Sequence, residues 1–226
     1  MLTSWEELPE WMKTDSVRQY YEMLDSKRIQ LSLKRLFDLV VSCILFLFFS
    51  PFMLIISIAI IVDSRGGILY RQDRVTQNGK IFRIHKFRTM VANADRIGSQ
   101  VTVGNDTRIT RVGAFLRKYR LDELPQLIDV VFGDMTFVGT RPEAVRYVKK
   151  YTPEMLATLL LPAGITSEAS IRFKDEAEML SKGENPDEVY TMQILPIKMK
   201  YNLDSIRHFS LINDIMTMIR TLLIIL

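Results

Sequence analysis

An uncharged apolar run from Leu39 to Val62 constrains this chain more than any other feature of its sequence. About 20 consecutive apolar residues are enough for one helical crossing of a bilayer. The run therefore predicts a membrane-inserted helix. A spanning anchor is the simplest topology, and two further features of the sequence favour a different one.

Ser50 and Pro51 interrupt the middle of this run. Proline has no N–H to donate to the carbonyl of Leu47, and its ring opens the helix at that point. The Ser50 hydroxyl can donate to a carbonyl one turn back, which makes a break tolerable in lipid. The pair therefore predicts a helix that is kinked or broken here.

Basic residues flank the run on both sides. Cytoplasmic flanks of membrane segments carry an excess of Lys and Arg, so two basic flanks favour a re-entrant hairpin helix over a spanning one. Asp38, at the start of the run, is expected to pair with Lys34 and Arg35 beside it rather than to take part in chemistry. The flanking cations are Lys27, Arg28, Lys34 and Arg35 before the run, and Arg65, Arg71, Arg74 and Lys80 after it.

Two further segments are candidates for a membrane surface. Phe209–Leu226 reads as an amphipathic helix lying in the headgroup plane, and a helix packed in the protein core is its alternative. The stretch Trp5–Leu33 is expected to lie on the membrane or to cap a neighbouring subunit. The polar face of the first segment consists of Asn213, Asp214, Thr217, Arg220 and Thr221.

Composition limits the class of the remaining chain. With 226 residues, 48% hydrophobic and 25% charged, it has the composition of a folded domain and excludes a disordered chain. A net charge of +4 suits phosphorylated substrates, anionic lipid or nucleic acid. No nucleic-acid-binding motif is present, which disfavours the last. Cys43 is the single cysteine, so no intramolecular disulfide is expected, and no cleavable signal peptide is visible.

A β-hairpin is predicted after the apolar run. Ile68–Val75 and Lys80–Arg88 are strand-like, and Asn78-Gly79 between them favours the left-handed angles of a tight turn. The period of two puts Lys86 and Arg88 on one face, where two cations could bind phosphate. A solvated edge strand with charged side chains is the alternative.

A helical period follows from Val112. Asp122 is predicted as the N-cap of a helix that carries Pro125 in its first turn and ends at Gly133. A carboxylate at that position stays ionised beside a site suited to phosphate, and can attack phosphorus. Capping alone is the structural alternative for Asp122 and Glu123.

The surroundings of this acidic pair are cationic, which indicates metal-assisted phosphoryl chemistry. Motifs of P-loop, Rossmann, zinc and serine-hydrolase enzymes are missing from the sequence, so those classes are disfavoured. The nearby cations are Arg108, Arg111, Arg117, Lys118 and Arg120, with Arg141 in a later Gly139–Glu143 turn.

Taken together, these motifs resemble the bacterial sugar transferases, small monotopic phosphoglycosyl transferases that start membrane-linked glycan assembly on polyprenyl phosphate. The similarity covers Lys34 to Leu226, with the motifs in the family's order. The matching blocks are Lys34–Asp38, Ser50–Pro51, Lys86–Met90, Leu116–Lys118, Leu121–Leu127, Gly133–Met135, Val138–Glu143 and Pro162–Thr166.

With the patterns above, the resemblance implies an α+β, mostly helical chain at the cytoplasmic face of the bacterial inner membrane. The expected parts are an N-terminal amphipathic extension over 1–33, a re-entrant membrane hairpin helix over 34–62, a cytosolic catalytic domain over 63–208 with a small β-hairpin and a helical core, and an interfacial amphipathic helix over 209–226.

The resemblance also implies a reaction. Asp122 would attack the β-phosphate of a UDP-sugar and release UMP, after which polyprenyl (undecaprenyl) phosphate would take the phosphosugar. Mg²⁺ would face Asp122 and Glu123, with Glu123 as a metal ligand or a base. Arg141 would lie near the nucleotide, and the cations expected to face phosphate are Arg117, Lys86 and Arg88.

Two departures from the family pattern stand out. Thr140 replaces a common proline before Arg141-Pro142, and the stretch after Thr166 lacks a common tryptophan and could shape sugar choice. Arg172–Glu178 is expected to lie on the surface, and lining the sugar site is the alternative.

The rival functions are a membrane-attached, non-enzymatic scaffold that recruits nucleic acid, and a glycosyltransferase that releases UDP. The sugar, the polyprenol length and a homo-oligomeric state stay open.

Overall fold

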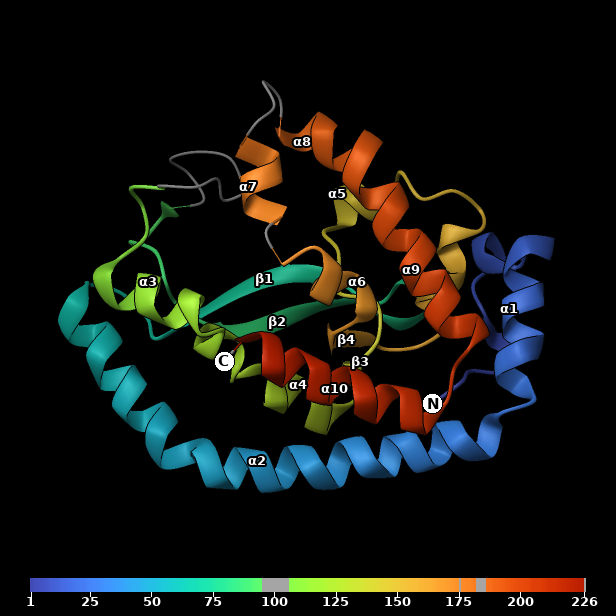
Figure 1. Cartoon of the computed structure of the whole chain (residues 1–226), viewed down its shortest axis with the longest axis horizontal. Coiled ribbons are helices and arrows are strands. Elements are labelled where there is room, and N and C mark those ends of the chain that lie inside the picture. The colour runs from blue at the N-terminus through green and yellow to red at the C-terminus, as the bar shows by residue number, and fades with distance from the viewer. Residues whose placement is uncertain (95–105, 175, 182–185, 226) are drawn as a thin grey trace.

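The computed structural model describes residues 1–94, 106–174, 176–181 and 186–225. Helices dominate and two small two-stranded sheets lie among them, which confirms the predicted α+β, mostly helical class (Figure 1). The helices are α1 (Asp15–Asp25), α2 (Arg28–Asp63), α3 (Arg111–Lys118), α4 (Gln126–Phe132), α5 (Val145–Val148), α6 (Glu168–Arg172), α7 (Glu176–Ser181), α8 (Pro186–Val189), α9 (Leu195–Arg207) and α10 (Leu211–Ile225). The strands are β1 (Leu69–Val75), β2 (Ile81–Phe87), β3 (Met135–Val138) and β4 (Ala163–Thr166).

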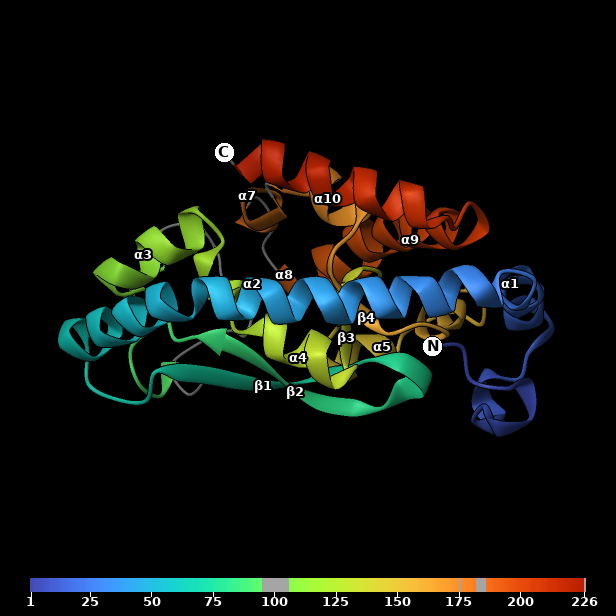
Figure 2. The same ribbon diagram turned by 90° about the horizontal axis from the view of Figure 1, so that it is seen from below.

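Helix α2 lies along one side of the molecule (Figures 1 and 2). It begins at Arg28, earlier than the predicted start at Lys34, and runs to Asp63. Within the described ranges it is the one helix long and apolar enough to cross a membrane. Only 11% of its most apolar stretch is buried, so its apolar side chains do not form a soluble core.

The local effect of the proline in α2 is as predicted. Ser50 Oγ donates to the carbonyl of Leu47 at 2.8 Å, the carbonyl that Pro51 leaves without its usual donor. The helix therefore continues through the proline. It bends in its second half (Figure 1) instead of forming two arms that pack against each other.

A buried polar cluster joins α2 to the rest of the chain. Lys34 Nζ lies 2.7 Å from Asp214 Oδ2 of α10 and 3.6 Å from Asp38 Oδ2. The Thr136 hydroxyl of β3 donates to Asp38. The predicted pairing of Asp38 with Lys34 is therefore confirmed. Both side chains are buried, since Lys34 is 2% exposed and Asp38 is 0% exposed.

Arg35 has a different partner from the predicted one. Its guanidinium donates to the carbonyls of Val130 at 2.6 Å and Val131 at 2.9 Å. These carbonyls belong to the last turn of α4, where the helix dipole favours a cation. Arg35 therefore holds α4 against α2, and the predicted pair with Asp38 is wrong because these C-terminal carbonyls compete for its guanidinium.

We expect Asp214→Ala to loosen the contact between α10 and α2. Leaving one charge of a buried pair alone costs about 3–5 kcal/mol. Because Asp38 still neutralises Lys34, we expect a loss of about 2 kcal/mol in the free energy of unfolding. Denaturant titration in detergent measures it. Asp204→Ala removes an exposed partner of His208 and should change stability by less than about 0.5 kcal/mol; an equal effect would contradict a role for the buried cluster.

Helix α10 contacts the protein through polar side chains and Met218, and most of its large apolar side chains are exposed. Thr221 Oγ1 lies 2.8 Å from Thr166 Oγ1, and Arg220 lies 3.0 Å from Glu168. A helix packed in a protein core has the opposite orientation, so the core-packing alternative is wrong. The exposed side chains are Ile212, Met216, Ile219, Leu222, Leu223 and Ile224.

The predicted hairpin is present. Strands β1 and β2 are antiparallel, and the turn contains Asn78 at φ 56° and Gly79 at φ 76°. A Cβ on Gly79 would lie 2.5 Å from the Trp11 ring, so the N-terminal segment covers this turn. Helix α1 buries Val17 and Leu24 against α9 and the Met155–Leu159 turn. The stretch over 1–33 thus packs on its own chain.

Candidate active site

Two of the predicted cations, Lys86 and Arg141, contact the Glu123 carboxylate. Lys86 Nζ, from β2, lies 2.9 Å from Glu123 Oε1. The Arg141 guanidinium, from the turn after β3, donates to the same oxygen and to Oε2 at 3.3 Å. A carboxylate that is 10% exposed is thus neutralised by two cations from separate elements.

Asp122 lies in a 3₁₀ turn between two helices. Leu121–Glu123 forms that turn, and α4 begins later, with Pro125 at the capping position and no capping side chain. The predicted N-cap role of Asp122 is therefore wrong. Arg120, at φ 55°, reverses the chain after α3 and presents the acidic pair on the connecting segment.

Crossing backbones hold Arg141 in place. Strands β3 and β4 are parallel, and a Cβ on Gly164 would lie 2.2 Å from the backbone of Gly139, a distance that only glycine permits. Gly164 N donates to the Thr140 carbonyl at 2.8 Å, and Arg141 Nη1 donates to the Ile165 carbonyl at 3.3 Å. Because Thr140 contributes its carbonyl here, the missing proline leaves this contact intact.

The Asp122 carboxylate differs from the Glu123 carboxylate in its surroundings. It is partly exposed, and within the described residues no donor is hydrogen-bonded to it. Burial raises its pKa, the negative charge of Glu123 adds to that effect, and the charges of Lys86 and Arg117 oppose it. A carboxylate that lies among cations and accepts no hydrogen bond from the described residues is available as a nucleophile.

Glu123 has the opposite electrostatics. Burial alone would raise its pKa, but the charges of Arg141 and Lys86 outweigh burial and hold the pKa well below its ordinary value. In turn, Glu123 raises the pKa of Arg141. Burial lowers the pKa of Lys86, and Glu123 opposes that shift. Two cations thus favour the ionised form of Glu123, which disfavours a role for it as a base.

The structure separates the two remaining predicted cations. Arg117 Nε donates to Thr89 Oγ1 at 2.8 Å, and burial lowers the pKa of Arg117 while Asp122 opposes that shift. Arg88 follows the end of β2 and donates to the Ser64 carbonyl at 2.7 Å and to that of Arg65. It closes the C-terminal end of α2 and is not brought to the cluster around Glu123.

Of the two residues of the acidic pair, Asp122 is the one suited to hold Mg²⁺. In the described part of the chain no three His, Cys, Asp or Glu side chains are grouped as metal ligands. Magnesium commonly takes one or two carboxylates together with substrate phosphates and water. The oxygens of Glu123 already accept from Lys86 and Arg141, so Asp122 is the carboxylate able to hold the ion.

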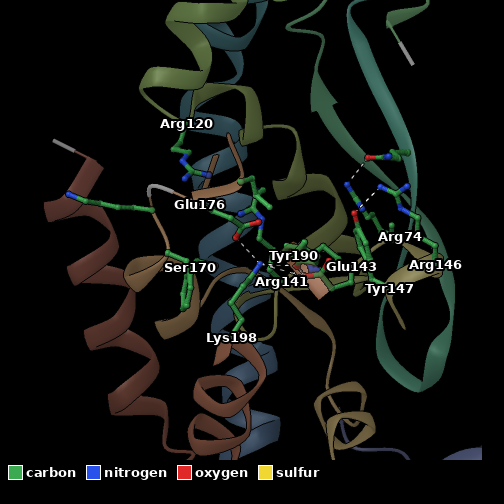
Figure 3. A pocket seen from close by; sticks show the side chains of 16 residues that line it. Arg74, Arg120, Arg141, Glu143, Arg146, Tyr147, Ser170, Glu176, Tyr190 and Lys198 are labelled. Atoms are coloured by element: carbon green, nitrogen blue, oxygen red, sulfur yellow. Dashed lines mark hydrogen bonds and ion pairs between the residues drawn. The ribbon is translucent and has the colours of Figure 1, made fainter. Parts of the chain in front are cut away.

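A cavity of about 340 Å³ opens beside Arg141 (Figure 3). Arg120 and Arg141, which both interact with Glu123, line it. The other lining residues come from segments distant in sequence, and sequence reasoning missed most of them. They include Arg74, Glu143, Tyr147, Ser170, Tyr190 and Lys198.

Three cavity residues fall in a segment that was expected to lie on the surface, with a sugar-lining role as the alternative. Of Arg172–Glu178, Arg172 is exposed, Asp175 lies outside the described residues, and Phe173, Lys174 and Glu176 line the cavity. A sequence signal for the cavity does exist: Tyr190 and Lys198 are eight residues apart in helical chain, which puts them on one face.

Comparisons with known proteins identify a family. Its sequence model, described as "Bacterial sugar transferase", matches residues 29–226. The chain is 39% identical over 162 residues to a UDP-glucose:undecaprenyl-phosphate glucose-1-phosphate transferase of Klebsiella pneumoniae, covering 69% of this chain and 34% of the relative. It is 34% identical over 191 residues to a protein of the same name from Caulobacter vibrioides, covering 83% of this chain and 67% of the relative.

A further relative carries a different sugar in its name. It is a UDP-N-acetylgalactosamine-undecaprenyl-phosphate N-acetylgalactosaminephosphotransferase of Aeromonas hydrophila, 40% identical over 123 residues, which cover 54% of this chain and 29% of the relative. The chain thus spans about a third of the length of the Klebsiella and Aeromonas relatives.

Proposed function

Because the chain belongs to the bacterial sugar transferase family, we propose that it transfers a sugar phosphate from a UDP-sugar to undecaprenyl phosphate and releases UMP. The observation that carries the proposal is the Asp122 carboxylate, which has no hydrogen-bonded donor in the described part of the chain and lies in the field of Lys86, Arg117 and Arg141. This arrangement supplies a nucleophile and the charges that a diphosphate requires.

In the first step, an oxygen of Asp122 attacks the β-phosphorus of the UDP-sugar. The bond between that phosphorus and the bridging oxygen breaks, and its electron pair leaves with UMP. No proton has to move, since both the nucleophile and the leaving phosphate are anions. Lys86, Arg117 and Arg141 neutralise the charge that develops on the phosphoryl oxygens. A bound Mg²⁺, which Asp122 fits, would supply further neutralisation of the diphosphate.

In the second step, a phosphate oxygen of undecaprenyl phosphate attacks the same phosphorus. The bond to Asp122 breaks, which restores the carboxylate and gives undecaprenyl diphosphosugar. Glu123 takes no proton in either step, because its low pKa leaves it ionised. It holds Lys86 and Arg141 beside the reacting phosphorus.

The outward apolar faces of α2 and α10 support attachment to a bilayer. The two helices are in contact through Lys34 and Asp214, and Figures 1 and 2 show them side by side. We place this face in the membrane, with α2 re-entrant and the catalytic cluster on the cytoplasmic side. The most exposed apolar side chains of α2 are Ile29, Leu47, Phe48, Leu54, Ile55 and Val62.

Single cysteines test the re-entrant topology. In a Cys43→Ala background we place a cysteine at Gln30 or at Arg65, both exposed and on opposite sides of the apolar run. In inside-out vesicles both sites should react with a membrane-impermeant maleimide, and in intact spheroplasts neither should. Labelling from opposite sides would show that α2 spans the bilayer.

The released nucleotide tests the function. The full chain in lipid nanodiscs is given undecaprenyl phosphate, Mg²⁺ and a panel of UDP-sugars. We expect UMP in amounts equal to the lipid-linked product. Release of UDP would show transfer of the sugar alone, and absence of both nucleotides for every sugar would count against a transferase.

A further inference from the structure

The cavity beside Arg141 is cationic, and two carboxylates also line it (Figure 3). Ser170 adds a hydroxyl to the lining. The carboxylates are Glu143 and Glu176, and the cations are Arg74, Arg120, Arg141, Arg146, Lys174 and Lys198.

A hydrogen-bond network holds the two carboxylates of the cavity in place. Lys198 Nζ lies 2.9 Å from Glu176 Oε2 and 3.0 Å from the Tyr190 hydroxyl. Tyr190 donates to Glu143, whose carboxylate is also 3.6 Å from Lys198. Lys198 and Tyr190 are buried, whereas the Glu176 side chain is 29% exposed, so its carboxylate borders the open space.

The Glu176 carboxylate is suited to hydroxyl groups and unsuited to phosphate. A carboxylate repels an anion, so the phosphates belong beside the arginines that line the cavity. A hydroxyl donates to a carboxylate, and a sugar ring carries several neighbouring hydroxyls. A uracil ring, with one N–H donor and two carbonyl acceptors, has less use for a carboxylate.

Resting on the proposed function, we infer that Glu176, held in place by Lys198, binds hydroxyls of the transferred sugar and determines which UDP-sugar is used. The sugar is bonded to the phosphorus that Asp122 attacks, so it must lie within one phosphate of the acidic pair. Arg141, whose guanidinium contacts Glu123, lines the cavity. The cavity is therefore adjacent to the place where the sugar must begin.

Two variants and a matched control test this inference. Glu176→Gln keeps the size of the side chain and removes its charge, and Ser170→Ala removes a neighbouring hydroxyl. Glu154→Gln is the control, because Glu154 makes an ion pair with Arg207 at 3.0 Å and does not line the cavity. For each protein, kcat/KM for UMP release is measured with the UDP derivatives of glucose, galactose, N-acetylglucosamine and N-acetylgalactosamine. Inhibition by UMP is measured alongside.

We expect Glu176→Gln to change the ratio of kcat/KM between two of these sugars by at least about 10-fold, the factor for one lost hydrogen bond to a charged group. UMP inhibition and the control should change by less than about twofold. Equal losses for all sugars, or weakened UMP inhibition, would overturn the inference in favour of a structural or nucleotide-binding role. If the wild-type chain releases no UMP, the proposed function fails instead, and calorimetric binding of the same UDP-sugars against UMP then tests the cavity separately.

Discussion

Asp122→Asn is expected to lower kcat for UMP release by about 10⁴-fold or more, since the amide cannot attack the β-phosphorus. The replacement keeps the size of the side chain, and Asp122 has no hydrogen-bond donor among the described residues. The loss should therefore be catalytic. UMP release under saturating UDP-sugar measures it, and Asp204→Asn, an exposed site outside the cluster, should keep full activity.

The stability of the same variant provides a second readout. Because burial raises the pKa of Asp122, the ionised carboxylate destabilises the folded chain at neutral pH, and this cost disappears as pH falls below the raised pKa. Asp122→Asn should then be at least as stable as wild type at pH 7, with the difference shrinking in acid. An inactive variant that is also strongly destabilised would point to a structural role for Asp122.

Glu123→Gln is expected to lower kcat by about 10²–10³-fold, the range for losing one preorganised electrostatic contact. Glu123 neutralises Lys86 and Arg141, and it opposes the effect of burial on the Lys86 pKa. Without it, the pKa of Lys86 falls further and the lysine loses its charge at lower pH. The activity loss should therefore grow as pH rises.

A pH profile separates this positioning role from the two predicted at first. The basic limb of the profile should move to lower pH in Glu123→Gln, and Lys86→Arg should return it toward wild type, because arginine stays charged. If Glu123 were a general base, the acidic limb would disappear instead. If it held the metal, the main change would be a higher Mg²⁺ requirement with an unmoved basic limb.

Local chemistry accounts for what could be predicted from the sequence. The hydrogen bond from Ser50 to Leu47 follows from the missing N–H of Pro51, and the hairpin turn follows from the left-handed preference of Asn78 and Gly79. Both depend on residues within a few positions of each other, which is why no tertiary information was required.

The errors share a tertiary cause. Arg35 was expected to pair with Asp38 but donates to the carbonyls at the end of α4, which are distant in sequence. Asp122 was expected to cap a helix, but Arg120 in a left-handed conformation places it on a separate turn. Neither the position of α4 nor this turn can be inferred from the spacing of residues.

The cavity shows the same limit at the level of function. Glu176, Tyr190 and Lys198 come from α7, the turn before α9 and α9 itself, and the parallel pairing of β3 with β4 aligns Arg141 beside them. Glu176, Tyr190 and Lys198 belong to no recognisable motif. The two carboxylates of the acidic pair could be found from sequence, whereas their opposite pKa shifts depend on Lys86 from β2 and Arg141 from the turn after β3.

The most direct test of the account is the position of the covalent phosphosugar. The full chain in nanodiscs is incubated with the preferred UDP-sugar and Mg²⁺ but without undecaprenyl phosphate, quenched, digested and analysed by mass spectrometry. A sugar-phosphate adduct should be found on Asp122, should vanish on adding undecaprenyl phosphate, and should be missing in Asp122→Asn. An adduct on another residue, or UMP release by an Asp122→Asn protein, would contradict Asp122 as the nucleophile.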